Sequence, residues 1–300
     1  MPSGLGWVAT PAFSGAVIQA AVPLYLLVLG ALVCERAGLV NLGLEGMVLA
    51  GACVGAAMAP RLGPGPGIAF GVLAGVWLAL LHALATIQFG VDQVVSGLAL
   101  NVLAFGAARP LATSAFGATG ISPRLEHLPA IAVPWLGALS PLVPLALLIG
   151  LAVLAALRFG VAGLRLDAAA AAPRIAEGAG LDTDRLRYAS LAICGALAGL
   201  AGAGLSVELA GHYQAGITQG RGFLALAVCV LVGRSTLAGL VAATLLGALQ
   251  AVPPFLLVGS GAVLLQAAPW LVVLVALALL GRRPRRAGTV PDRWRAGVTL

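Results

Sequence analysis

Long stretches of this chain carry no charged side chain. No Asp, Glu, Lys or Arg occurs from Pro2 to Cys34 or from Gly46 to Pro60. Of the 300 residues, 61% are hydrophobic and 9% are charged, whereas a soluble protein of this size needs far more polar surface to cover its core. The sequence therefore predicts an all-α polytopic membrane protein with a single transmembrane domain over residues 1–300.

Apolar runs of about 17 to 25 residues, the length of a helix that crosses a bilayer, predict about nine transmembrane helices, within a range of about eight to ten. The seventh run is short, and it is compatible with a full crossing, a half-helix or a merger with its neighbour. No positive side chain precedes Arg36, so we expect the first run to be a retained span rather than a signal peptide. The predicted spans are 13–34, 38–58, 67–88, 91–108, 139–157, 188–208, 222–233, 236–257 and 261–280.

All 17 basic residues are arginines. They lie at the ends of the apolar runs and in a basic tail over 281–300, without the interleaved aromatic residues expected of a nucleic-acid-binding protein. If the seventh run crosses, 13 arginines lie on one side and 4 on the other, so the positive-inside rule places the N-terminus outside and the C-terminus in the cytoplasm. The inner arginines are at positions 36, 158, 165, 174, 185, 187, 234, 282, 283, 285, 286, 293 and 295, and the outer ones are at 61, 109, 124 and 221.

Residue types that carry metal-binding or catalytic chemistry are scattered. The cysteines show no C-x-x-C pair and no histidine at ligand spacing, so we expect core residues and no metal site. The chain contains no lysine, which excludes the ATP-binding motif G-x-x-x-x-G-K-[ST]. The motif G-x-S-x-G is also absent, so enzymatic catalysis is not indicated. The four cysteines are Cys34, Cys53, Cys194 and Cys229.

One polar island, ERAGLVNLGLEGMVLAG over residues 35–51, interrupts the apolar sequence. If it is helical, Gly38, Asn41 and Glu45 share one face, and Glu45 lies roughly 10 Å into the hydrocarbon. A bare carboxylate there costs about 2.5 to 3.5 kcal/mol. We therefore expect this face to meet protein or water, with Gly43 and Gly46 allowing close helix contact.

A second polar group lies in DQVVSGLALNVLAFG, which begins at Asp92. Gln93 and Asn101 stand eight residues apart and fall near one helix face, with Ser96 between them. Such side chains either line a polar path or hold helices together at about 0.6 kcal/mol each. The residue pattern leaves both alternatives open.

Three of the connections between predicted spans are longer or more polar than a simple turn. The inner one, 158–187, favours a short helix with Pro173 in its first turn and Gly180 at its end; it is either a surface for a partner protein or a solvated linker. The outer one, 109–138, is expected to pack as irregular structure over an entrance. A further outer loop, between Glu208 and Arg221, is read as exposed loop polarity rather than as a docking surface; it contains His212, Tyr213 and Gln214.

Small residues four apart predict close helix packing in the membrane. Such pairs are Gly51 and Gly55, Gly71 and Gly75, and Gly195 and Gly199.

Four segments together carry a family resemblance. ERAGLVNLGLEGMVLAGA, DQVVSGLALNVLAFG, PRIAEGAGLDTDRLRY and GRGFLALAVCVLVGRSTLAG are similar to the membrane permease subunits of bacterial ABC importers. This broad class includes simple-sugar and branched-chain amino-acid permeases. The chain most resembles permeases that work with a basic-membrane-protein-type nucleoside-binding lipoprotein. The resemblance covers about residues 20 to 280 and implies a bundle like that of type II ABC importers.

The resemblance also implies roles for particular residues. The signature at the second span, next to the translocation path, is matched by Glu35, Gly38, Asn41, Gly43, Glu45 and Gly46. The cytoplasmic segment that docks on the ATPase is matched by Pro173, Arg174, Glu177, Gly178, Gly180 and Asp182. Independently of the resemblance, the polar residues within the predicted spans are the candidates for the path: Asn41, Glu45, Gln93, Ser96 and Asn101. Asp92 stands where asparagine is about as common in the family, so we expect no special role for its charge.

The implied assembly is a multi-pass importer of the bacterial plasma (inner) membrane that works by alternating access. Its other parts are a second permease subunit, identical or related, two cytoplasmic ATP-binding subunits, an extracytoplasmic solute-binding lipoprotein and membrane lipids. This chain is expected to bind no cofactor, because ATP is used by the partner subunit. It is also expected to bind no nucleic acid.

The resemblance favours a nucleoside or a related small polar solute, although the 16 aromatic residues show no obvious platform for stacking a base. Simple sugars and branched-chain amino acids are the alternative solutes. From other classes, an ion-coupled secondary transporter that uses Glu45 and a membrane scaffold also fit the polar residues.

Overall fold

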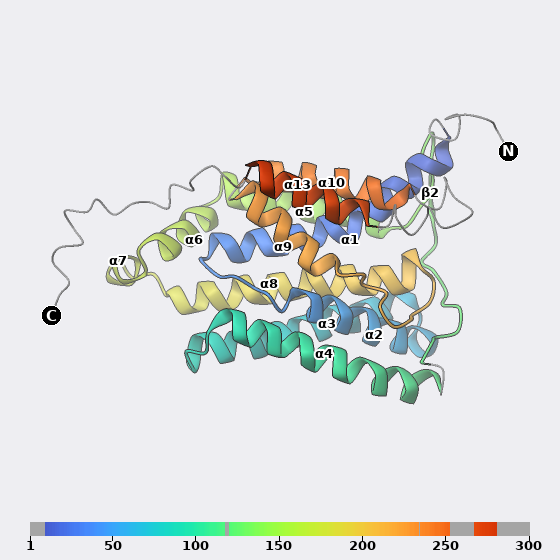
Figure 1. Cartoon of the computed structure of the whole chain (residues 1–300), viewed down its shortest axis with the longest axis horizontal. Coiled ribbons are helices and arrows are strands. Elements are labelled where there is room, and N and C mark those ends of the chain that lie inside the picture. Colours follow the sequence, from blue (N-terminus) through green and yellow to red (C-terminus); the bar gives the residue numbers. More distant parts are fainter. Residues whose placement is uncertain (1–9, 118–119, 234, 253–266, 281–300) are drawn as a thin grey trace.

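The helices of this chain run side by side along one long axis (Figure 1). The structure is a computed structural model, and it describes residues 10–117, 120–233, 235–252 and 267–280. The predicted basic tail, Arg234 and parts of the last two predicted spans lie outside the described residues. The helices are α1 Pro11–Arg36, α2 Leu44–Leu62, α3 Pro64–Ala83, α4 Gln93–Phe116, α5 Leu142–Arg158, α6 Val161–Ala171, α7 Pro173–Gly178, α8 Thr183–Ala203, α9 Arg221–Val232, α10 Thr236–Ala251 and α13 Ala268–Leu280.

Within the described residues, four helices are long and apolar enough to cross a membrane, and a fifth candidate is a bent pair. The π-helical segments η2 (Leu84–Gln88) and η3 (Gly204–Leu209) extend α3 and α8. The bent pair is α5 and α6, which meet at 63°. The predicted all-α membrane class is confirmed, apart from one short hairpin. The four helices are Phe13–Arg36, Pro64–Gln88, Gln93–Phe116 and Thr183–Leu209.

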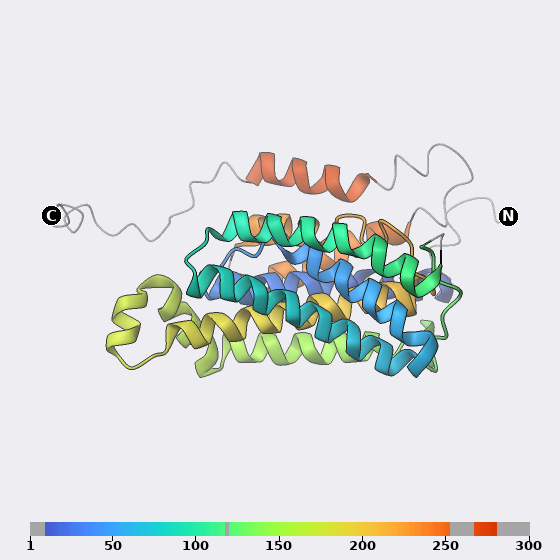
Figure 2. The same cartoon turned by 90° about the horizontal axis from the view of Figure 1, so that it is seen from below.

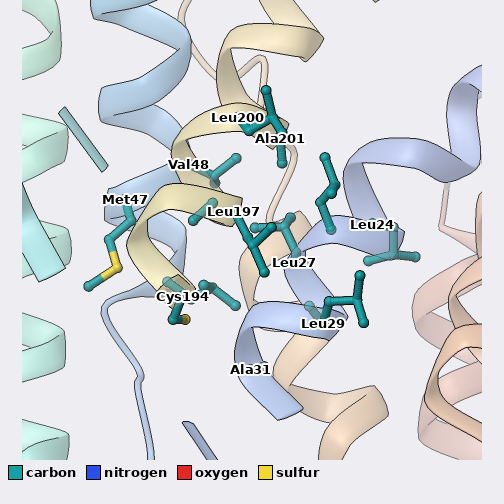
Figure 3. Close-up of a cluster of buried hydrophobic side chains, with 14 of the residues drawn as sticks. Leu24, Leu27, Leu29, Ala31, Met47, Val48, Cys194, Leu197, Leu200 and Ala201 are labelled. Carbon is teal, nitrogen blue, oxygen red and sulfur yellow. The ribbon is translucent and has the colours of Figure 1, made fainter. Parts of the chain in front are cut away.

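Helices α1 and α8 form the centre of the bundle. About four fifths of their apolar windows are buried by the protein itself, 78% for α1 and 83% for α8, against 39% for α3 and 33% for α4. Figure 3 shows Leu27 of α1, Val48 of α2 and Leu197 of α8 in one buried cluster. Figure 2 shows α13 on the outside of the bundle. Much of the surface of α3 and α4 is therefore left to lipid or to another protein.

The predicted glycine contacts are present between α2, α3 and α8. A Cβ atom added at Gly51 would stand 2.5 Å from the carbonyl oxygen of Gly199, and one added at Gly199 would stand 2.5 Å from that of Gly71. Such distances leave no room for a side chain, so the three backbones touch through their glycines. The small-residue pairs in the sequence thus mark a real three-helix contact.

The outer connection begins later than predicted. Helix α4 continues through Pro110 to Phe116 because the effective stop signal is Gly117, whose φ of 87° ends the helix while its N–H bonds to Thr113. After it, strands β1 (Ile131–Val133) and β2 (Gly137–Leu139) form an antiparallel hairpin. This hairpin lies beside the start of α1 (Figure 1).

Helices α6 and α7 extend beyond the bundle at the opposite end, as both Figure 1 and Figure 2 show. As predicted, Pro173 is the first residue of a short helix and Gly180, with a φ of 84°, follows its end. The Ala-rich stretch before it forms the separate helix α6.

Candidate functional site

The polar island is broken rather than helical throughout. Gly38 adopts a φ of 76°, its N–H bonds to the carbonyl of Glu35, and the N–H of Leu39 bonds to that of Cys34. This bonding pattern ends a helix in a left-handed glycine. The single helix expected to carry Gly38, Asn41 and Glu45 on one face is therefore wrong. Residues 37–43 run back along the bundle from the end of α1 to the start of α2 (Figure 1).

Helix α4 holds this non-helical segment in place. The Oε1 atom of Gln93 accepts the N–H of Val40 at 2.8 Å. Eight residues on, Asn101 donates from Nδ2 to the carbonyl of Leu42 at 2.8 Å and accepts the N–H of Gly46 at 2.7 Å. Gln93 and Asn101 therefore lie on one face of α4, as expected. Their side chains bond to backbone groups of residues 40, 42 and 46, which lack helical partners because this segment is not helical or begins a helix.

Asn41 and Ser96 also bond to protein groups. Asn41 is 1% exposed; its Oδ1 accepts the N–H of Gly43, and its Nδ2 approaches sulfur atoms of Met47 and Cys194 at 3.4 Å. Ser96 is also buried, and its hydroxyl lies 2.9 Å from Nδ1 of a buried histidine, His82. Gly43 is the N-cap residue of α2, and Glu35 lies in the last turn of α1.

Glu45 joins two helix N-termini. It is the second residue of α2 and is 1% exposed. Its Oε1 accepts the N–H of Gly220 at 3.2 Å, and its Oε2 accepts the N–H of Gly222 at 2.7 Å. These N–H groups belong to the start of α9, where the helix dipole favours a negative charge. The buried carboxylate thus faces protein, as the cost of a bare charge in hydrocarbon requires.

Arg221, between those two glycines, is buried as well. Its side chain donates to Oε1 of Gln250 at 2.8 Å and to the carbonyl of Ile217 at 3.2 Å, and it is attracted by Glu45. The interpretation of the 208–221 loop as exposed polarity is therefore wrong for Arg221 and for Tyr213, which is 2% exposed. Arg221 was counted among the four outer arginines, but it is buried in the bundle and does not lie on the surface.

The outer loop is tied to its surroundings by further bonds. Ser122 and Tyr213 exchange two hydrogen bonds, the N–H of Ser122 to the Tyr213 carbonyl and the N–H of Tyr213 to the Ser122 hydroxyl. Glu208 accepts the N–H of Leu128 at 2.8 Å and the hydroxyl of Ser140 at 2.5 Å. His212 is half-buried and Gln214 is exposed. The loop is thus a structured cover over this end of the bundle.

The inner segment presents an exposed surface on a rigid base. Arg174, Glu177 and Gly178 are exposed on α7, and the Thr183 hydroxyl donates to Glu177 at 2.5 Å. Asp182 caps α8 by accepting the N–H of Arg185 at 2.9 Å. These two bonds connect α7 and the turn after it to the start of α8, a central helix of the bundle.

The arrangement around Glu45 suits the holding of α2 against the start of α9 rather than bond-making chemistry. Among the described residues, no group of three or more His, Cys, Asp or Glu side chains could hold a metal ion. Each proposed path residue has a hydrogen-bond partner within the protein. These contacts are of the kind that holds helices together, and a role of the five residues in a solute path stays a prediction.

Sequence reasoning missed the partners of Glu45. Gly220 and Gly222 flank Arg221 in the segment GRGF, and a Cβ atom added at Gly222 would lie 2.7 Å from the Cα atom of Glu45. Two glycines around an arginine at a helix start are a signal for such an approach. The hydrogen bond between Arg221 and Gln250 has no comparable signal in the sequence.

The Gln93 contact leads to a first prediction. Gln93→Leu removes the acceptor for the Val40 N–H and is expected to lower the free energy of unfolding by about 1 kcal/mol. Gln93→Glu keeps an acceptor oxygen there and is the matched control, with thermal stability in detergent close to the wild type. Equal stability of the leucine variant and the wild type would show that this bond does not hold the segment.

Comparisons with known proteins bear on the whole chain. Residues 15–280 match the family described as the permease component of branched-chain amino acid transport systems. No solved structure is matched by the chain.

Three curated permease sequences are similar to this chain. A Haloferax volcanii protein, provisionally named as the glucose ABC transporter permease TsgC13, is 34% identical over 79% of this chain and 75% of its own. The guanosine ABC transporter permease NupQ of Bacillus subtilis is 31% identical over 70% of this chain and 72% of its own. The nucleoside ABC transporter permease NupC of Lactococcus lactis is 28% identical over 86% of this chain and 88% of its own.

Proposed function

The chain belongs to the family of permease components of branched-chain amino acid transport systems, and from that premise we propose that it forms the translocation path of an ABC importer for a nucleoside. The relatives are ABC permeases, which are transport components rather than enzymes, and the chain is a multi-pass protein of the plasma membrane. The observation that carries the proposal is the family match over residues 15–280 together with the exposed α7 at one end of the bundle.

The proposed topology has about nine crossings, with the N-terminus outside. Its support is the distribution of arginines: Arg158, Arg165, Arg174 and Arg185 lie on or beside α6 and α7, at the opposite end from the hairpin. The positive-inside rule makes the α7 end cytoplasmic. Helix α9, with 12 residues, is about 18 Å long, so it would complete its crossing together with the non-helical segment 210–220.

The proposed partners are two cytoplasmic ATPases, a second permease subunit and an external solute-binding lipoprotein. Helix α7 offers the ATPase an apolar side chain, Ile175, which is 75% exposed, between Arg174 and Ala176. The Glu177 to Thr183 bond connects this surface to α8. ATP-driven closure of the ATPases can open or close the solute path only if the docking helix is rigidly connected to a central span.

Two of the relatives are named for nucleosides or guanosine and one for glucose. A nucleoside is therefore the favoured solute and a simple sugar the alternative. A secondary transporter that uses Glu45 as its ion-coupling group is disfavoured by the two backbone bonds that hold its carboxylate.

The test is uptake into membrane vesicles that contain the chain and its partner subunits. We expect ATP-driven guanosine uptake that excess glucose does not inhibit. Ile175→Asp is expected to reduce it at least ~10-fold, because docking of an apolar anchor worth about 1.5 kcal/mol or more is lost. Thermal stability should be unchanged, since the side chain is exposed.

Arg61→Ala, at the opposite end of the bundle, is the matched control and should keep full uptake. Co-purification of the ATPase subunits is the second measurement, and it should fail for Ile175→Asp only. Uptake that follows an imposed ion gradient without ATP would overturn the importer proposal.

A further inference from the structure

A cavity of about 430 Å³, with a mostly apolar lining and a few polar groups, opens near the outer end of α4. Phe105, Arg109 and Thr113 form one wall, and because they follow at intervals of four they share one face of the helix. The facing wall is the segment after η3, with Tyr213 and Gln214. The volume falls in the range of small-molecule sites, about 300 to 1,000 Å³.

The charge of this cavity selects between solute classes. Of the 12 described residues that line it, none is Asp or Glu, and one is an arginine. No ion pair among the described residues involves Arg109. A solute with an ammonium group would find repulsion and no counter-charge here. Arg109 can pair with the carboxylate of an amino acid, but the ammonium group of the zwitterion finds no partner among the described lining residues, whereas a neutral solute with hydrogen-bond acceptors meets no such conflict.

The hydrogen-bonding groups of the cavity indicate more closely which class of neutral solute fits. The guanidinium of Arg109 offers a planar fork of donors, which matches two adjacent acceptors such as O6 and N7 of guanine. Phe105, four residues before it and 49% exposed, offers a flat apolar face for a base. Thr113 and Gln214 add groups that can bond to sugar hydroxyls. Adenine presents a donor where guanine has O6, so it cannot take both bonds.

We propose that this cavity is a solute site for 6-oxopurine nucleosides, in which Arg109 binds the base edge and Phe105 supports its face. The inference rests on the proposed import of a nucleoside and specifies which nucleosides are accepted. Phe105 would be the stacking surface for the base that the sequence did not reveal. The sequence alone does not show that Phe105, Arg109 and the facing loop line one cavity.

The site is connected to the Glu45 contact. Leu49, which forms its floor, lies one helical turn after Glu45 on α2. Its loop wall ends at Gly216, and Gly220, four residues further, donates to the Glu45 carboxylate. A solute in the cavity would thus touch α2 and the loop that leads into α9.

The test is protection of a cysteine in the cavity from chemical labelling. Ala215→Cys places a thiol on the exposed loop wall, and the four native cysteines are buried. We use the full chain, co-expressed with its partner subunits, in lipid nanodiscs with a membrane-impermeant maleimide. Guanosine and inosine are expected to slow labelling, whereas adenosine, glucose and leucine at equal concentration are not.

Arg109→Gln in the same background is expected to raise the half-protecting guanosine concentration at least ~10-fold, the effect of losing one bidentate contact to a base. Arg61→Gln, which lies outside the cavity, should leave it unchanged, and both variants should keep wild-type thermal stability. Equal protection by adenosine, or no protection by millimolar guanosine, would overturn the proposal.

Uptake separates this inference from the proposed function. ATP-driven guanosine uptake by the wild type without protection of the cavity would overturn the site and leave the importer. Guanosine protection without ATP-driven uptake would support the site and overturn the importer.

Discussion

Replacement of Glu45 by alanine is expected to lower the melting temperature in detergent by at least ~5 °C and to abolish uptake. The change leaves the N–H groups of Gly220 and Gly222 buried without their acceptor. Each unsatisfied buried group costs about 1 to 3 kcal/mol, and about 2 to 4 °C is lost per kcal/mol in chains of comparable size. Arg221 in addition loses the nearby negative charge.

The matched control is Glu126→Ala, which removes a carboxylate from the exposed outer segment and should shift the free energy of unfolding by less than ~0.5 kcal/mol. Glu45→Gln keeps one acceptor oxygen and should fall between the two. Thermal unfolding followed by size-exclusion chromatography measures all three. A Glu45→Ala protein as stable as the control would mean that α2 and the start of α9 are held together by other contacts.

The sequence was sufficient for the membrane class and for the positions of most helices, because hydropathy is summed locally along the chain. The predicted runs 13–34, 139–157 and 188–208 overlap α1, α5 and α8 with its η3 extension. The short α7 and its terminal glycine were also predictable, since a proline at the first turn and a glycine after the end are local signals.

The break at Gly38 was not predicted because hydropathy does not report backbone conformation. The predicted second span, 38–58, was expected to be helical from residue 38, yet a left-handed Gly38 ends α1 and the next helix, α2, begins only at Leu44. Arg36 in the last turn and Gly38 beyond it are the usual signs of a helix end. They were outweighed by the expectation that the apolar run 38–58 is one helix.

The glycines around Arg221 signal a close approach, but the sequence does not identify Glu45 as the partner, because Glu45 is 175 and 177 residues away from Gly220 and Gly222. Counting arginines on either side of the membrane also assigns every arginine to the surface. Arg221 breaks that assumption, since Gln250 and Ile217 satisfy its donors inside the bundle. Such long-range pairing depends on which helices become neighbours, and hydropathy does not determine that.

Gly199→Leu is expected to prevent folding of the bundle, whereas Gly106→Leu is expected to be tolerated. At Gly199 the first side-chain atom would already stand 2.5 Å from the Gly71 carbonyl oxygen and 2.8 Å from the Cα atom of Val72. Both are backbone atoms of α3 and cannot rotate away, so α3 and α8 would have to separate. Overpacking by smaller additions already costs about 1 to 3 kcal/mol.

Gly106 is the matched control because it is also a helical glycine in an apolar span, yet a Cβ atom there has nothing within 4 Å. The measurement is the yield of monodisperse protein after detergent extraction, with Gly199→Ala as an intermediate step. If close glycine contact holds α2, α3 and α8 together, yield falls in the order wild type, Gly199→Ala, Gly199→Leu while Gly106→Leu stays high. Similar yields of the two leucine variants would instead show that the bundle can accommodate a side chain at this contact, and that membrane hydropathy rather than backbone approach sets its stability.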